Sequence, residues 1–259
     1  MSNLLINPYS AIERSPWPFL ISISLLNLFS SMIMMFNKKL MDYKVVLCFF
    51  SFSLIVILWM QDLENESMCG MHTIDIQKGM KLGMILFISS EIMFFFSFFW
   101  GYFHFFIAPL ETWPPLGIKT IDPLKVPLLS TLILVTSGVT LNISHFNLMN
   151  NKCKVAKKFL LITVIFGFFF TLLQLQEFYE SYFVISDGIY GALFYITTGF
   201  HGIHVILGSL MLLTNYTKFF TKLMSCYKMC SFEISAWYWH FVDVVWLFLY
   251  LFLYWGSMI

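Results

Sequence analysis

Residues 236–250 read AWYWHFVDVVWLFLY, an almost continuous apolar and aromatic run that decides the fold. Ionisable side chains cost about 2.5–3.5 kcal/mol at the centre of a bilayer, so they face protein or water instead of lipid. His240 and Asp243 interrupt the run at a spacing that puts them on one side of a helix, where they can satisfy each other. Trp239 and Trp246 lie on the same side. The run therefore predicts a transmembrane helix that faces the protein interior.

The composition of the whole chain indicates a helical membrane protein. Of 259 residues, 59% are hydrophobic and only 11% are charged, whereas a typical soluble domain has about 25% charged residues. The apolar runs are continuous rather than alternating, which favours helices over a barrel. The formal net charge of +1 gives no indication of a nucleic-acid partner.

Stretches of about 20 apolar residues predict seven transmembrane helices, which we interpret as a single membrane domain over residues 1–259. The predicted spans are 16–36, 42–60, 79–107, 126–146, 157–180, 188–216 and 232–256. If the N-terminus lies inside, ten of the fifteen basic residues lie on that side, in agreement with the positive-inside rule. The C-terminus is then outside. We expect no cleavable presequence, because residues 1–15 lack a basic segment followed by an apolar core.

Glu91 lies near the middle of the third predicted span, in the sequence LFISSEIMFFF of residues 86–96. One interpretation is a protonated carboxyl that is hydrogen-bonded to a neighbouring helix; the other is a group that handles protons or contacts lipid. Carboxyl groups within membrane spans are usually functional, which favours the second. The same span carries small or polar residues at intervals of seven, a stripe that predicts close helix packing: Gly83, Ser90, Ser97 and His104.

Two histidines, His201 and His204, are three residues apart on the sixth span and share a helix face. Such a pair could ligate a metal or haem. No carboxylate is placed to complete a site, so packing and interhelical hydrogen bonds are the favoured interpretation. Cys226 and Cys230 have no histidine nearby, which favours ordinary thiols over a metal site. We expect neither a metal nor a catalytic group in this chain.

Several ordered segments resemble those of the family of subunit III of cytochrome c oxidase. They include SPWP at 15–18, WPPLGI at 113–118, TLLQ at 171–174, GFHGIHV at 199–205 and WYWHFVDVVW at 237–246. The resemblance covers nearly the whole chain. It implies an all-α integral membrane protein whose seven transmembrane helices are arranged as two plus five around a lipid-filled cleft.

The resemblance also implies a function. The chain would be a non-redox core subunit of the respiratory terminal oxidase, which reduces oxygen to water with proton pumping, while haem and copper lie in partner subunits I and II. It would contact those and smaller subunits, stabilise the catalytic subunit, hold phospholipids and support proton uptake. Its location would be the mitochondrial inner membrane, with the N-terminus on the matrix side and the C-terminus on the intermembrane side.

The same resemblance implies roles for particular residues. Glu91 matches a membrane carboxyl of the family that reacts with carbodiimides. Gln61 and Asn65 stand where the family usually has arginines, so strong phosphate donors are missing at that end. The contacts to lipid head groups carry over to four residues: Trp59, Glu66, His72 and Lys81.

The alternative function is a self-contained proton or solute carrier that uses Glu91 and the membrane histidines. Such carriers often show inverted repeats and broken helices, and the two halves of this sequence show neither. The remaining polar groups within the spans are interpreted as structural: His201, His204, His240 and Asp243.

Overall fold

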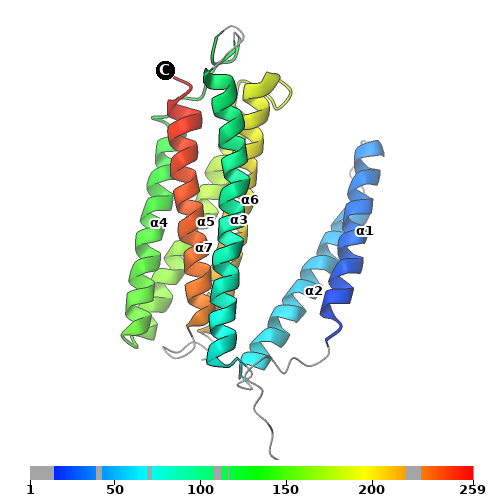
Figure 1. Ribbon diagram of the computed structural model, residues 1–259, viewed down its shortest axis with the longest axis vertical. Coiled ribbons are helices and arrows are strands. Elements are labelled where there is room, and N and C mark those ends of the chain that lie inside the picture. The colour runs from blue at the N-terminus through cyan, green and yellow to red at the C-terminus, as the bar shows by residue number, and fades with distance from the viewer. Residues whose placement is uncertain are drawn as a thin grey trace, which may run out of the picture. The chain divides into compact units, whose positions relative to one another are not determined.

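The computed structural model describes residues 15–38, 43–68, 72–107, 112–115, 117–219 and 229–258, which form helices and no strand (Figure 1). Seven α-helices follow one another in these ranges, and the last continues as a π-helix. They are α1 (Trp17–Lys38), α2 (Tyr43–Met68), α3 (Ile74–Ile107), α4 (Val126–Met149), α5 (Cys153–Glu180), α6 (Gly188–Lys218), α7 (Cys230–Leu249) and η1 (Tyr250–Trp255). All seven spans are long and apolar enough to cross a membrane, which confirms the predicted class of all-α membrane protein.

Two helices, α2 and α3, extend furthest beyond the spans predicted from the sequence. α2 continues to Met68 instead of ending at residue 60, and α3 begins at Ile74 instead of residue 79. The prediction counted only apolar residues, whereas a helix can continue through polar residues once it has left the hydrocarbon. Gln61 and Asn65 therefore lie on a helix and not in a loop.

The contacts divide the chain into two units, residues 1–80 and 81–259, and the division falls inside α3. In the first unit α1 packs on α2, and the indole N–H of Trp17 donates to the carboxylate of Asp62 at 2.8 Å. The second unit contains α4 to α7 and most of α3. This division agrees with two plus five helices. The lipid-filled cleft and the single domain over residues 1–259 stay predictions.

The core of the second unit is a group of four helices in which α4, α5, α6 and α7 each contact the next and α7 closes on α4 (Figure 1). α4 and α5 approach each other through small side chains. The Ser144 hydroxyl donates to the Ala156 carbonyl at 2.8 Å, and the hydroxyls of Thr140 and Thr163 are 2.8 Å apart. Lipid is as apolar as leucine, so close packing and polar contacts hold membrane helices together.

Trp239 of α7 is fully buried in the middle of this four-helix group. Its indole N–H donates to the Ser137 hydroxyl on α4 at 2.9 Å. Its ring fills space left by two glycines: a β-carbon at Gly167 of α5 would lie 2.7 Å from the ring, and one at Gly208 of α6 would lie 2.9 Å from it. Trp246 is also fully buried, which confirms that this side of α7 faces the interior.

α3 packs on the four-helix group through aromatic rings. The Phe94 ring lies 5.0 Å from that of Phe200 on α6, and the Phe95 ring lies 6.3 Å from that of Phe241 on α7. The predicted close packing along the seven-residue stripe is wrong within the second unit, because its members are exposed and a β-carbon at Gly83 would meet nothing within 4 Å. Those exposed residues are Gly83, Ser90, Ser97 and His104.

Candidate functional site

Glu91 of α3 and His204 of α6 form a polar pair between two membrane helices. The Nε2 atom of His204 lies 2.9 Å from Oε2 of Glu91, and the two side chains are 10% and 21% exposed, respectively. The other ring nitrogen, Nδ1, lies 2.6 Å from the carbonyl oxygen of Phe200. Because a carbonyl oxygen can only accept a hydrogen bond, Nδ1 carries a hydrogen.

This geometry requires one further proton between Glu91 and His204. If the imidazole is neutral, its Nε2 is an acceptor and the carboxyl group must donate. If both ring nitrogens are protonated, the imidazolium donates to a carboxylate. In both forms the pair has no net charge, and the proton can pass along the 2.9 Å contact. The pair can therefore hold a proton inside the membrane without introducing a charge there.

Aromatic rings surround the imidazole of His204. The Phe95 ring of α3 lies 5.1 Å from it, and the rings of Tyr238 and Phe241 on α7 each lie 6.3 Å from it. Apolar surroundings strengthen a hydrogen bond and raise the cost of leaving either partner unpaired. Both residues of the pair were identified from the sequence, but their pairing was not, because they are 113 positions apart.

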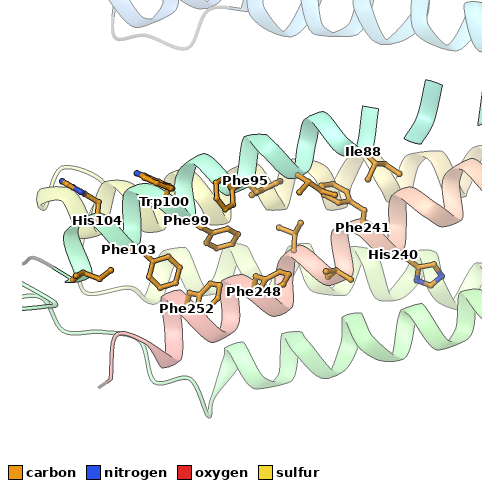
Figure 2. A pocket seen from close by; sticks show the side chains of 15 residues that line it. Ile88, Phe95, Phe99, Trp100, Phe103, His104, His240, Phe241, Phe248 and Phe252 are labelled. Atoms are coloured by element: carbon orange, nitrogen blue, oxygen red, sulfur yellow. The ribbon is translucent and has the colours of Figure 1, made fainter. Parts of the chain in front are cut away.

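An apolar groove of about 1040 Å³ lies between α3 and α7 (Figure 2). His104 lies toward one end of it and His240 toward the other. Two of the residues that line it, Phe95 and Phe241, also contact the ring of His204. The groove was not predicted from the sequence, although phenylalanines at helical spacing are its signal, four apart on α3 and seven and four apart along α7 and η1. These are Phe95, Phe99, Phe103, Phe241, Phe248 and Phe252.

Lys81 near the start of α3 forms an ion pair with Glu233 near the start of α7. The side chains are 36% and 25% exposed, respectively. The cation assigned to lipid head groups therefore already has a carboxylate partner. An ammonium group has three donors, so this pairing leaves capacity for a second anion.

The other three residues assigned to lipid head groups lie in the first unit, whereas Lys81 lies in the second. Trp59 and Glu66 are partly buried on α2 and are seven residues apart, on one side of the helix. His72 precedes α3, and its carbonyl oxygen accepts a hydrogen bond from the side-chain amide of Gln77 at 3.2 Å. The assignment of these residues to lipid stays a prediction.

His201 is fully buried and faces α7. Its Nε2 lies 3.2 Å from the carbonyl oxygen of Val242, and its ring lies 5.1 Å from that of Trp246. His201 and His204 are thus close in sequence but bond to different helices. Among the described residues, no three His, Cys, Asp or Glu side chains come together to hold a metal ion. Cys226 lies outside the described residues.

His240 and Asp243 face each other on α7, but Nδ1 and Oδ2 are 3.8 Å apart, which is too long for a hydrogen bond. His240 instead places Nε2 3.0 Å from Oδ1 of Asn142 on α4. Asp243 lies against Gly138 of α4, where a β-carbon would be 2.7 Å from its Oδ2. The two polar side chains therefore anchor α7 on α4. Asn142, a polar residue within the predicted fourth span, was the signal in the sequence for this contact.

Comparisons with known proteins agree over nearly the whole chain. A family model described as cytochrome c oxidase subunit III matches residues 7–258. A protein named cytochrome c oxidase subunit 3 from Rhipicephalus sanguineus is 44% identical over 97% of this chain and 100% of its own length. Proteins of the same name from Mammuthus primigenius and Homo sapiens are 45% and 44% identical, each over 95% of this chain and 96% of their own.

Proposed function

The chain belongs to the family of cytochrome c oxidase subunit III, and from that premise we propose that it is a non-catalytic subunit that holds lipid and supports proton uptake. It is a subunit of cytochrome c oxidase, the terminal respiratory oxidase, which is an oxidoreductase complex. Family membership argues against the self-contained carrier. The proposed location is the mitochondrial inner membrane, with the N-terminus on the matrix side and the C-terminus on the intermembrane side.

The proposed division of labour places haem and copper in partner subunits I and II, and phospholipids on this chain. Support comes from how the membrane histidines are used. His201 faces a backbone carbonyl, His204 a carboxyl, and His240 a side-chain amide. Each contact joins a ring nitrogen to an oxygen atom of a neighbouring helix, so these side chains hold pairs of helices together. Stabilising the catalytic subunit requires such a rigid body beside it.

The observation that carries the proposed lipid role is the apolar groove between α3 and α7. Its α3 wall runs from Ile88 to Ile107, a rise of about 28 Å, which is close to the roughly 30 Å of a bilayer's hydrocarbon core. Among the residues that the structure describes, no acidic or basic side chain other than histidine lines it. We therefore assign it to phospholipid acyl chains, whose apolar length it matches.

The proposed support of proton uptake rests on Glu91 and His204. The His204 ring contacts Phe95 and Phe241, which line the groove, and its Nε2 lies 2.9 Å from Oε2 of Glu91. A proton can pass between the two side chains while the pair stays neutral. Such an exchange avoids the large cost of an uncompensated charge in apolar surroundings. The pair is thus suited to holding a proton near the lipid that occupies the groove.

A tryptophan in the groove tests the lipid assignment. Val244 lines the groove and is 50% exposed, whereas Leu247 is 41% exposed on the same helix and does not line it. Oxidase carrying Val244→Trp should co-purify with less phospholipid by mass spectrometry than oxidase carrying the control Leu247→Trp. Unchanged phospholipid in Val244→Trp would contradict the assignment. Release of a partner subunit without loss of lipid would show that a protein helix occupies the groove instead.

A further inference from the structure

Seven buried polar atoms inside the second unit have no hydrogen-bond partner among the described residues, and five of them belong to one group of four side chains on α5, α6 and α7. These five are both amide atoms of Gln174 and Oε2 of Glu177 on α5, Nδ1 of His201 on α6, and Nε1 of Trp246 on α7. None of the four residues is more than 4% exposed. Folded proteins rarely leave buried polar atoms unpaired, so this cluster requires a ligand. The cluster shares no residue with the groove or with the Glu91–His204 pair, so neither site provides a partner for these atoms.

Phe170 of α5 holds the inner end of the cluster together. Its ring lies 5.5 Å from that of His201 and 4.7 Å from that of Trp246, and the latter two rings are 5.1 Å apart. Gln174 follows one turn later on the same side of α5. The Gln174 side chain therefore lies on the side of α5 where Phe170 contacts His201 and Trp246.

The π-helix Tyr250–Trp255 brings Tyr254 to the other end of the cluster. A π-helix bonds each residue to the fifth along the chain, so its turn is wider than that of an α-helix. Tyr254 consequently stays on the side of Trp246, with ring centroids 5.9 Å apart. Its hydroxyl donates to Oε1 of Glu177. Gln174 is close to both Glu177 and Tyr254, but no hydrogen bond of acceptable geometry joins its amide to them.

The unpaired atoms include both donors and acceptors. The Gln174 amide nitrogen and the Trp246 indole nitrogen donate, while the Gln174 oxygen accepts. In the neutral His201 ring, Nε2 carries the hydrogen because it faces a carbonyl, so Nδ1 accepts. N–H donors repel a cation, and the lone pairs of Nδ1 and the Glu177 carboxyl repel an anion. A small molecule that both donates and accepts fits this set.

We infer that ordered water molecules occupy the space between α5, α6 and α7 and hydrogen-bond Gln174, Glu177, His201 and Trp246. Internal waters typically make about three hydrogen bonds to buried polar groups that lack protein partners. The group contains five unpaired atoms on three helices, more than a single water can satisfy with its two to four hydrogen bonds. At least two waters are therefore required. They form a hydrated line from near the end of α5 into the middle of the four-helix group.

A density map of the intact oxidase that resolves ordered water tests the inference directly. Peaks are expected within hydrogen-bonding distance of the Gln174 amide and the Trp246 indole nitrogen. In oxidase with Gln174→Met, the peak beside residue 174 should be lost. A map in which the Gln174 amide bonds Glu177 and Trp246 directly, with no peak between them, would overturn the inference.

The sign of a stability change provides an independent test. If the site were dry, Gln174→Met would remove unpaired polar atoms and leave the half-life of oxidase activity on heating equal or longer. A hydrated site predicts a half-life several-fold shorter, because the waters lose two partners. The control is Gln176→Met, two residues away on the exposed side of α5, which should leave the half-life unchanged. If Gln174→Met prevents assembly, the density map of the unaltered oxidase is sufficient to test whether water occupies the site.

Discussion

The Nε2 atom of His204 lies 2.9 Å from Oε2 of Glu91, so a histidine of α6 and a carboxyl group of α3 complete each other's hydrogen bonding inside the membrane. The Phe200 carbonyl fixes the second ring nitrogen as a donor. Because α3 otherwise meets the four-helix group mainly through aromatic rings, this polar contact also specifies how α3 is rotated against α6.

Replacing His204 by Phe should weaken the attachment of α3, because the Glu91 carboxyl is left without its partner. The expected loss is about 1–3 kcal/mol, measured as the detergent or denaturant concentration at which this subunit leaves the oxidase. Glu91→Gln should lose much less, since its amide can donate to Nε2. The double variant Glu91→Leu with His204→Phe should recover most of the loss. Equal release of His204→Phe and the unaltered oxidase would contradict the pairing.

Gly167→Ala and Gly208→Ala should each destabilise the chain, because the new methyl group would lie 2.7 Å or 2.9 Å from the ring of Trp239. Overpacking of this kind typically costs about 1–3 kcal/mol. Gly202→Ala is the matched control on α6, since a β-carbon there would meet nothing within 4 Å. The thermal midpoint of subunit release should fall for the first two variants only. A similar fall for all three would show that the Trp239 packing is not the cause.

Asp243→Asn should reduce assembly more than turnover per assembled complex. Asp243 is pressed against Gly138 and faces His240, which bonds Asn142, so the carboxyl contributes to anchoring α7 on α4. Native gel electrophoresis would give the assembled fraction, and oxygen consumption per haem would give turnover. Glu180→Gln, at an exposed position, serves as the control. Normal assembly with abolished proton pumping would contradict an anchoring role.

Lys81→Gln should change stability by only about 0–1 kcal/mol, because its ion pair with Glu233 is partly exposed. If Lys81 also contacts lipid phosphate, the same variant should retain less anionic phospholipid on purification. Glu233→Gln frees the ammonium group and should retain more. Lys78→Gln alters a more exposed lysine one turn away, paired with Asp75, and should leave lipid content unchanged. Equal lipid content in all three variants would show that Lys81 does not bind lipid phosphate.

Sequence patterns predicted the inward side of α7 because tryptophans and an ionisable pair recur there at helical spacing, and Trp239 and Trp246 are indeed fully buried. The same sequence patterns could not predict which neighbouring helix each polar side chain contacts. His201 and His204 share a broad face, yet one bonds α7 and the other α3. That choice depends on how helices far apart in sequence are rotated. The stripe at Gly83 is not packed within the second unit for a related reason, since small residues permit close packing without requiring it.

The ends of α2 and α3 were also beyond sequence reasoning based on hydropathy. Apolar length marks where a helix crosses hydrocarbon, and it carries no information about how far the helix continues into water. Polar residues from Gln61 to Ser67 are therefore helical although they lie outside the predicted span.

We propose that this chain modulates an oxidase whose chemistry resides in other subunits. Oxygen consumption by complexes with and without the chain, followed over many turnovers at neutral and alkaline pH, tests it most directly. The account predicts largely intact initial turnover in the depleted complex, followed by faster inactivation and a greater loss of rate at alkaline pH, where protons are scarce. Glu91→Gln should reproduce part of this effect. A depleted complex that is inactive from its first turnover would contradict the account.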